Sequence, residues 1–103
     1  MVECKFLAYE YKASGENERH ERDEFILDIV KDLCIRLFRD GAGGETRLII
    51  SFFSESYYGK LLEFLKESGF GALYQVEIGV DRIIRITFND RWNALWRGMI
   101  VHR

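Results

Sequence analysis

The sequence has no proline and few of the residues that build metal or redox sites. Only two cysteines and two histidines occur among its 103 residues. The cysteines, Cys4 and Cys34, form no CxxC motif, and no cysteine–histidine metal spacing is present. We therefore predict no metal and no cofactor, and we expect both thiols to stay reduced and to behave as small hydrophobic side chains.

The chain also lacks any long apolar run. None approaches the ~20 residues that a helix needs to cross a bilayer, and the alternating start MVECKFLAYEYK does not resemble a signal peptide. Hydrophobic residues make up 48% and charged residues 31% of the chain, which is typical of a globular protein. We expect a single cytoplasmic domain, residues 1–103, with no membrane partner.

Positive charge exceeds negative charge only near the end of the sequence. The formal net charge is −2, a poor starting point for general nucleic-acid binding, because that affinity depends on neutralising phosphates. Residues 79–103, however, contain five arginines and two aspartates. Nucleic-acid binding therefore stays open as an alternative, with these candidate residues: Arg82, Arg85, Arg91, Arg97 and Arg103.

Hydrophobic periodicity predicts the element order β-α-β-α-β-β-α. We expect strands at 2–10, 46–53, 72–80 and 82–88, a long helix from the turn at 12–18 to about Arg39, a second helix at 54–68 and a short helix after Asn89. A right-handed crossover should make the first two strands parallel, and the last two should form a hairpin. The predicted fold class is α/β (α+β): a two-layer sandwich of a mixed four-stranded sheet with the two main helices on one face.

The two main helices should present broad apolar faces to the sheet. Ser14 or Asn17 is the expected N-cap of the first helix. The buried face of the first helix comprises Ile26, Ile29, Val30, Leu33, Cys34 and Leu37, and that of the second comprises Tyr58, Leu61, Leu62 and Leu65, with Tyr57 beside it. The consecutive apolar residues of 46–53 predict a strand that is covered on both faces.

Residues 51–60, SFFSESYYGK, form the passage from the second strand into the second helix. Ligands tend to lie beyond the carboxyl ends of parallel strands, and a helix start offers free N–H groups to an anion. A ligand or anion site here would comprise Ser54, Ser56, Tyr57 and Lys60, and it could also serve a small hydrolase or transferase. The alternative is structural, because serine is a preferred N-cap and Glu55 would repel an anion.

Acidic residues gather on one side of the first helix. Glu21, Glu24, Asp28 and Asp32 recur at steps of three and four residues, with His20 nearby. Such a cluster can coordinate a hard cation, but this side faces away from the apolar stripe, so a solvated surface is the favoured interpretation. The same surface could meet a basic partner.

The C-terminal segment DRWNALWRGMIVHR is rich in tryptophan and arginine. Trp92, Leu95, Trp96 and Met99 share one face of a predicted helix. They either close the core or contact a partner, since tryptophan and arginine are enriched at interface hot spots. Leu7, Tyr9, Phe53 and Ile83 are further apolar residues left outside the predicted core. The predicted interface residues are Leu7, Tyr9, Trp92, Trp96 and Met99.

We conclude from the sequence that a small non-catalytic protein-binding or regulatory module is the favoured function. Its partner would be another protein or a second copy of the chain, as in an inhibitor, an immunity protein or an adaptor. Two alternatives remain. One is a nucleic-acid-binding module that uses the C-terminal arginines, and the other is a small enzyme with its site at residues 51–60.

Overall fold

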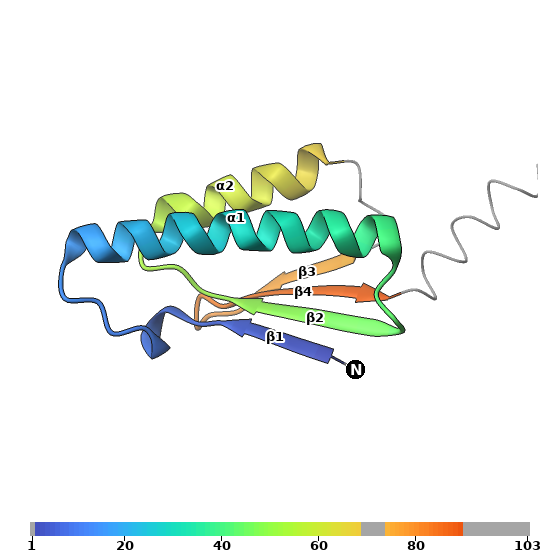
Figure 1. The fold of residues 1–103 in the computed structure, drawn as a ribbon, viewed down its shortest axis with the longest axis horizontal. Coiled ribbons are helices and arrows are strands. Elements are labelled where there is room, and N and C mark those ends of the chain that lie inside the picture. Colours follow the sequence, from blue (N-terminus) through green and yellow to red (C-terminus); the bar gives the residue numbers. More distant parts are fainter. Residues whose placement is uncertain (1, 69–73, 90–103) are drawn as a thin grey trace, which may run out of the picture.

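The computed structural model describes residues 2–68 and 74–89. They form strands β1 (Val2–Phe6), β2 (Glu45–Ile50), β3 (Tyr74–Ile78) and β4 (Ile84–Asn89), helices α1 (Glu16–Asp40) and α2 (Glu55–Glu67), and the short 3-10 helix η1 (Ala8–Glu10). Both α-helices lie on the same side of the sheet (Figure 1). The predicted combination of two main helices with a mixed four-stranded sheet is confirmed, whereas the predicted C-terminal helix lies outside the described residues.

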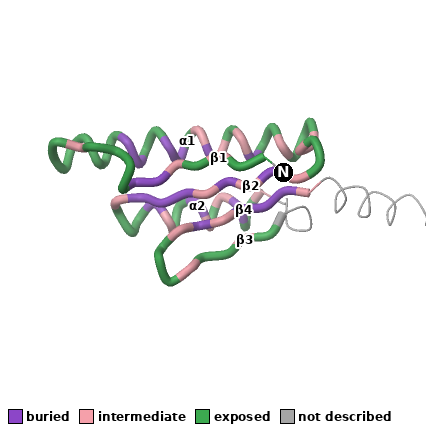
Figure 2. Tube along the Cα trace, turned by 90° about the horizontal axis from the view of Figure 1, so that it is seen from below, coloured by how far each residue is buried: buried purple, intermediate pink, exposed green. Residues whose placement is uncertain are grey.

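The sheet has the strand order β1-β2-β4-β3. β1 pairs with β2 in parallel, as a crossover through α1 requires, and the β3–β4 hairpin adds β4 antiparallel to β2. α1 covers the β1 side of the sheet and α2 the β3 side (Figures 1 and 2). The parallel pair therefore ends next to the first turns of α1 and the start of α2.

The core lies between the helices and one face of the sheet. Every second residue of β2 and β4 points into it, and the fully buried side chains include Leu48, Ile50, Ile84 and Ile86 from the sheet and Val30, Cys34 and Leu61 from the helices. The buried positions follow the middle of the fold in Figure 2. Burial of these side chains from water supplies most of the drive to fold.

The other face of β2 is less buried than the sequence predicts. Thr46, Leu48 and Ile50 are buried, while Arg47 and Ile49 between them are half-buried. The expectation of a strand covered on both faces is therefore wrong for the described residues. Alternate β2 residues face the helices, and long polar side chains such as Arg47 occupy the opposite face.

β1 is shorter than the predicted strand over residues 2–10. The ladder stops at Phe6 because the Ala8 N–H donates to Ser51 Oγ, at 2.8 Å, instead of continuing along β2. The Glu10 N–H then donates to the Leu7 carbonyl and closes η1. This turn lies beyond the end of β1 and does not extend the strand (Figure 1).

α1 does not begin at either predicted cap. Its N-cap is Gly15, and Asn17 lies inside the first turn. The Glu18 carboxylate instead accepts the Ser14 N–H at 2.8 Å, and this bond lowers the pKa of Glu18.

Among the described residues, neither helix combines the length and the apolarity that a membrane crossing requires.

Truncation of the core should destabilise the fold strongly. We expect Leu48→Ala to lower the free energy of unfolding by ~2–5 kcal/mol, because it opens a cavity at a fully buried position of a central strand. Urea unfolding followed by circular dichroism measures the effect. Val80→Ala is the control, since Val80 is 107% exposed and should change stability little. Equal effects at the two positions would contradict the core assignment.

Candidate functional site

A buried ion pair lies at the carboxyl ends of β1 and β2. Arg22 Nη1 is 3.1 Å from Asp23 Oδ1, and the two side chains are 6% and 0% exposed. The same Arg22 nitrogen donates to the Ser51 carbonyl at 2.7 Å. Because an uncompensated buried charge is costly, these bonds fix the start of α1 against the loop that follows β2.

The Asp23 carboxylate binds the backbone at the start of α2. It accepts the Phe53 N–H at 3.0 and 3.1 Å and the Ser54 N–H at 2.9 Å. Ser54 is the N-cap of α2 but makes no side-chain capping bond; its hydroxyl lies 3.1 Å from that of Ser56. The chain's own carboxylate thus lies at the helix start where the sequence predicts an anion.

Tyr57 is the aromatic residue of α2 that the core contains. It is 1% exposed, whereas Tyr58 is only half-buried, so the predicted assignment of Tyr58 to the inner face and Tyr57 to its flank is reversed. The Tyr57 hydroxyl shares a 2.8 Å hydrogen bond with His20 Nδ1. Burial raises the pKa of Tyr57, and the negative charges of Glu24 and Asp23 raise it further. Tyr57 therefore remains a neutral phenol and not a base.

Aromatic and arginine side chains gather above this buried network. The Arg19 and Arg22 guanidinium groups lie 5.3 and 5.6 Å from the centre of the Phe53 ring, and Tyr11 meets that ring edge-on at 6.4 Å. Tyr9 is 74% and Tyr11 is 44% exposed. We call the surface formed by Tyr11, Arg19 and Phe53, together with the exposed Tyr9 of η1 two residues before Tyr11, the carboxyl-end surface.

A small cavity adjoins the carboxyl-end surface. Its volume is about 230 Å³, and it is lined by Glu16, Arg19, His20, Asp23, Phe53 and Ser54. The neighbouring segment 10–24 exposes five carboxylates against two cations: Glu10, Glu16, Glu18, Glu21 and Glu24 against Lys12 and Arg19. The surroundings are therefore acidic, and they favour a positively charged ligand over an anion.

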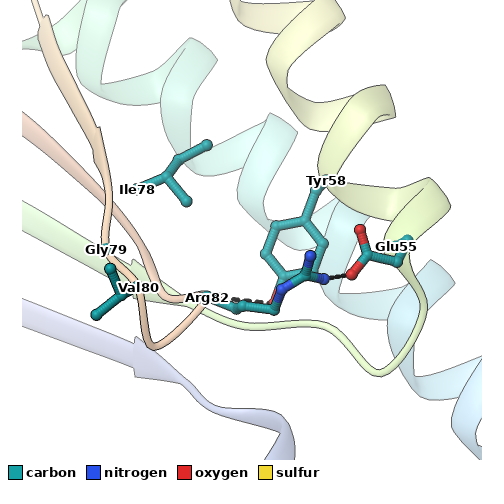
Figure 3. A pocket seen from close by; sticks show the side chains of 6 residues that line it. All are labelled: Glu55, Tyr58, Ile78, Gly79, Val80 and Arg82. Atoms are coloured by element: carbon teal, nitrogen blue, oxygen red, sulfur yellow. Dashed lines mark hydrogen bonds and ion pairs between the residues drawn. The ribbon is translucent and has the colours of Figure 1, made fainter.

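A second cavity lies between α2 and the β3–β4 hairpin. It measures about 330 Å³ and is lined by Glu55, Tyr58, Ile78, Gly79, Val80 and Arg82 (Figure 3). Tyr58 donates to the Arg82 carbonyl at 2.6 Å and accepts the Phe52 N–H at 3.0 Å, and Arg82 forms an ion pair with Glu55. Tyr58 thus connects the hairpin turn to the loop after β2.

The predicted ligand residues do not converge on one cavity. Ser54 lines the cavity beside the carboxyl-end surface, and Tyr57 points at His20. Lys60 lies over the Tyr57 ring, with its amino nitrogen 4.6 Å from the ring centre. Ser56 is exposed at the start of α2, and its hydroxyl lies 3.1 Å from that of Ser54.

The predicted interface and nucleic-acid residues are only partly described. Leu7 is buried within the chain and Tyr9 is exposed, while Phe53 and Ile83 are half-buried. Trp92, Trp96, Met99, Arg91, Arg97 and Arg103 lie outside the described residues. Of the two described arginines, Arg82 pairs with Glu55, and Arg85 pairs with Asp81 at 3.0 Å.

Sequence reasoning missed the Arg22–Asp23 pair. A signal was present, because Asp23 lies three and seven residues before Ile26 and Val30 and so continues their buried face. The contact between His20 and Tyr57 had no comparable signal, since it joins the outer flank of one helix to another helix 37 residues later.

The remaining reactive side chains show no catalytic arrangement in the described part of the chain. No three histidine, cysteine, aspartate or glutamate side chains there are placed to hold a metal ion. Both cysteines are free, and burial raises the pKa of Cys34 to about 12. A thiol in that state is not a nucleophile.

Comparison of the chain with protein-family models, curated proteins and solved structures finds no significant match.

Removal of the Asp23 carboxylate should destabilise the protein far more than removal of an exposed counterpart. We expect Asp23→Ala to lower the free energy of unfolding by ~3–5 kcal/mol, because Arg22 stays buried without its partner. Asp40→Ala is a matched control: Arg39 and Asp40 are also adjacent in α1 and also 3.1 Å apart, but their side chains are 66% and 61% exposed. Urea unfolding of both variants should show little change for Asp40→Ala. Equal losses would contradict the role of burial.

Tyr57 should ionise at a higher pH than a free tyrosine does. Its folded pKa lies above the ordinary value of 10.0, so folding favours the neutral phenol. That contribution to stability is complete below pH 10 and is lost as the pH rises through the raised folded pKa. Absorbance titration of tyrosinate should therefore show a late step among the five tyrosines, which Tyr57→Phe removes and Tyr58→Phe retains. Simultaneous ionisation of all five would refute this.

Proposed function

We propose that this chain is a non-catalytic protein-binding module and that its carboxyl-end surface docks a partner protein bearing basic side chains. The observation that carries the proposal is that Tyr9, Tyr11, Arg19 and Phe53 lie at the surface above the buried Arg22–Asp23 pair, whose charged groups are hydrogen-bonded. Tyrosine and arginine are enriched among the residues that dominate binding energy at interfaces. Edges where parallel strands end are also favoured places for binding.

The buried network supports binding because it holds the surface in place before a partner arrives. Asp23 fixes the backbone N–H groups of Phe53 and Ser54, and Arg22 contacts the Phe53 ring from below the surface. Side chains that are already ordered lose less conformational entropy on association. More of the free energy gained from contacts with a partner is therefore retained as affinity.

Charge complementarity indicates the class of partner. The segment 10–24 exposes five carboxylates and two cations, and His20 there lies 3.6 Å from Glu24. A partner with lysine or arginine around an apolar anchor would be attracted to this surface, whereas an acidic partner would be repelled. The free thiols of Cys4 and Cys34 suit a reducing compartment, so we retain the cytoplasm as the proposed location.

The described arginines give less support to nucleic-acid binding. Arg82 and Arg85 both pair with carboxylates of this chain, so contact with phosphate would have to break those pairs. On the sheet face opposite the helices, Arg47 likewise lies 3.8 Å from the carboxylate of Glu3. These neighbours leave little positive charge for a phosphate backbone.

A hydrolase or transferase at residues 51–60 has weaker support as well. The Asp23 carboxylate already accepts the N–H groups of Phe53 and Ser54. Glu55, the first residue of α2, forms an ion pair with Arg82, and Tyr57 is held neutral by its raised pKa. Neither a ready base nor a free anion position is evident among these side chains.

Peptide selection tests the proposal directly. A display library of random peptides selected on the wild-type protein should yield sequences that combine basic and apolar side chains. Because exposed tyrosines often act as hot spots, Tyr9→Ala should weaken the selected peptides by roughly tenfold or more in fluorescence anisotropy. Binding should also weaken at higher salt, since charge attraction contributes to it.

Val80→Ala serves as the control for the selection, because Val80 is exposed in the turn between β3 and β4 and lines the second cavity, not the carboxyl-end surface. It should leave peptide affinity unchanged. Short RNA and DNA strands are measured in parallel. Acidic peptides, affinities indifferent to Tyr9→Ala, or tighter binding of nucleic acid than of any selected peptide would overturn the proposal.

A further inference from the structure

The outer edge of β1 has no strand beside it in the described part of the chain. β1 is the first strand of the order β1-β2-β4-β3 and pairs only with β2. Unpaired strand edges are templates for pairing with another chain, and proteins usually protect them with charge, proline or a covering segment. β1 contains no proline, and its two charged residues, Glu3 and Lys5, have opposite signs.

The backbone of β1 directs a defined set of groups outwards. The Phe6 carbonyl accepts the Ser51 N–H at 2.9 Å, so Phe6 bonds towards β2. Backbone groups alternate along a strand, and Cys4 therefore also bonds towards β2, while Glu3 and Lys5 direct their N–H and C=O groups away from it. These four outward groups are available for a further strand.

We propose that this edge binds a second copy of the chain, with β1 pairing antiparallel to its counterpart about a two-fold axis at Cys4. In this register Glu3 lies opposite the partner's Lys5 on both sides of the axis, and the outward backbone groups of these residues bond to each other. Val2 lies opposite the partner's Phe6, and the two Cys4 residues face each other. The strand is therefore complementary to itself in both charge and apolar character.

The flank of α1 above this edge also suits self-association. Phe25 is 64% exposed, and Ile29, one turn later, is half-buried. On the helix they lie opposite His20 and Lys31, which contact side chains of α2. α1 covers the β1 side of the sheet (Figure 2).

The outer edge of β3, at the opposite side of the described sheet, lacks this complementarity. An antiparallel self-pairing of β3 centred on Val76 would place Gln75 opposite the partner's Glu77, so no opposite charges would meet. The charge pattern thus selects β1 rather than β3.

Charge reversal at the two paired positions tests the register. In Glu3→Lys or Lys5→Glu alone, like charges would oppose each other twice per dimer, and we expect the dissociation constant to rise roughly tenfold to a hundredfold. An equimolar mixture of the two variants should restore association, because every opposed pair is then of opposite sign. Light scattering should report twice the 12.2 kDa chain mass for the wild type and for the mixture, but not for either variant alone.

Cysteine cross-linking tests the position of the axis. Residues directly opposite in a non-hydrogen-bonded pair lie about 4.5 Å apart between Cα atoms, which allows a disulfide. Oxidation by copper–phenanthroline in air should remove one proton and one electron from each Cys4 thiol and join the chains. Cys34, buried and with a raised pKa, should not react. Cys34→Ala should retain the cross-link and Cys4→Ser should abolish it.

Three results would overturn the inference: a monomeric wild type at every concentration, a dimer that neither charge reversal weakens, or a dimer that Cys4 does not cross-link. Circular dichroism of each variant excludes loss of folding as the cause. The inference is independent of the proposed function, because peptide binding at Tyr9 is measured separately on the charge-reversed variants.

Discussion

The buried pair of Arg22 and Asp23 is the constraint on which the functional end of this fold depends. Two charges that leave water must be satisfied by nearby dipoles, and the loop between β2 and α2 supplies them. Both charges therefore hold the loop: Arg22 donates to the Ser51 carbonyl, and Asp23 accepts the N–H groups of Phe53 and Ser54. The position of α1 over the sheet and the start of α2 are set by the same contacts.

The two proposed interactions use different parts of the surface. The carboxyl-end surface carries aromatic rings beside carboxylates, and it lies where the parallel strands end. The outer edge of β1 carries alternating charge instead, and within residues 2–68 and 74–89 no strand pairs with its backbone. Because the edge runs along the side of the sheet and the aromatic residues lie beyond its end, self-association and partner binding need not compete. A dimer would present the carboxyl-end surface twice, which raises avidity for a repeated or dimeric target.

Local sequence patterns predicted the elements of this fold much better than its contacts. Period-two and helical spacing located the strands and both main helices, and the apolar stripe of α1 contains the buried Val30 and Cys34 as expected. The end of β1, the absence of a serine cap on α1 and the burial of Tyr57 instead of Tyr58 were not predicted. Each of these depends on a side chain that bonds to backbone or to another residue outside the periodic pattern, as the Ala8–Ser51 bond illustrates. A carboxylate within an apolar stripe, such as Asp23, is the one feature of the site that the sequence could have revealed.

Ser51 joins three segments that are distant in the sequence. Its hydroxyl accepts the Ala8 N–H, 43 residues away, and its carbonyl accepts Arg22, 29 residues away. Contacts of such separation form only after the intervening chain has closed, and loop closure costs entropy before the contact repays it. Folding would therefore complete the binding end of the molecule late, after the helices and the hairpin have formed from nearer neighbours. A nascent chain would gain its docking surface only once β1, α1 and β2 had come together, which couples recognition to completed folding.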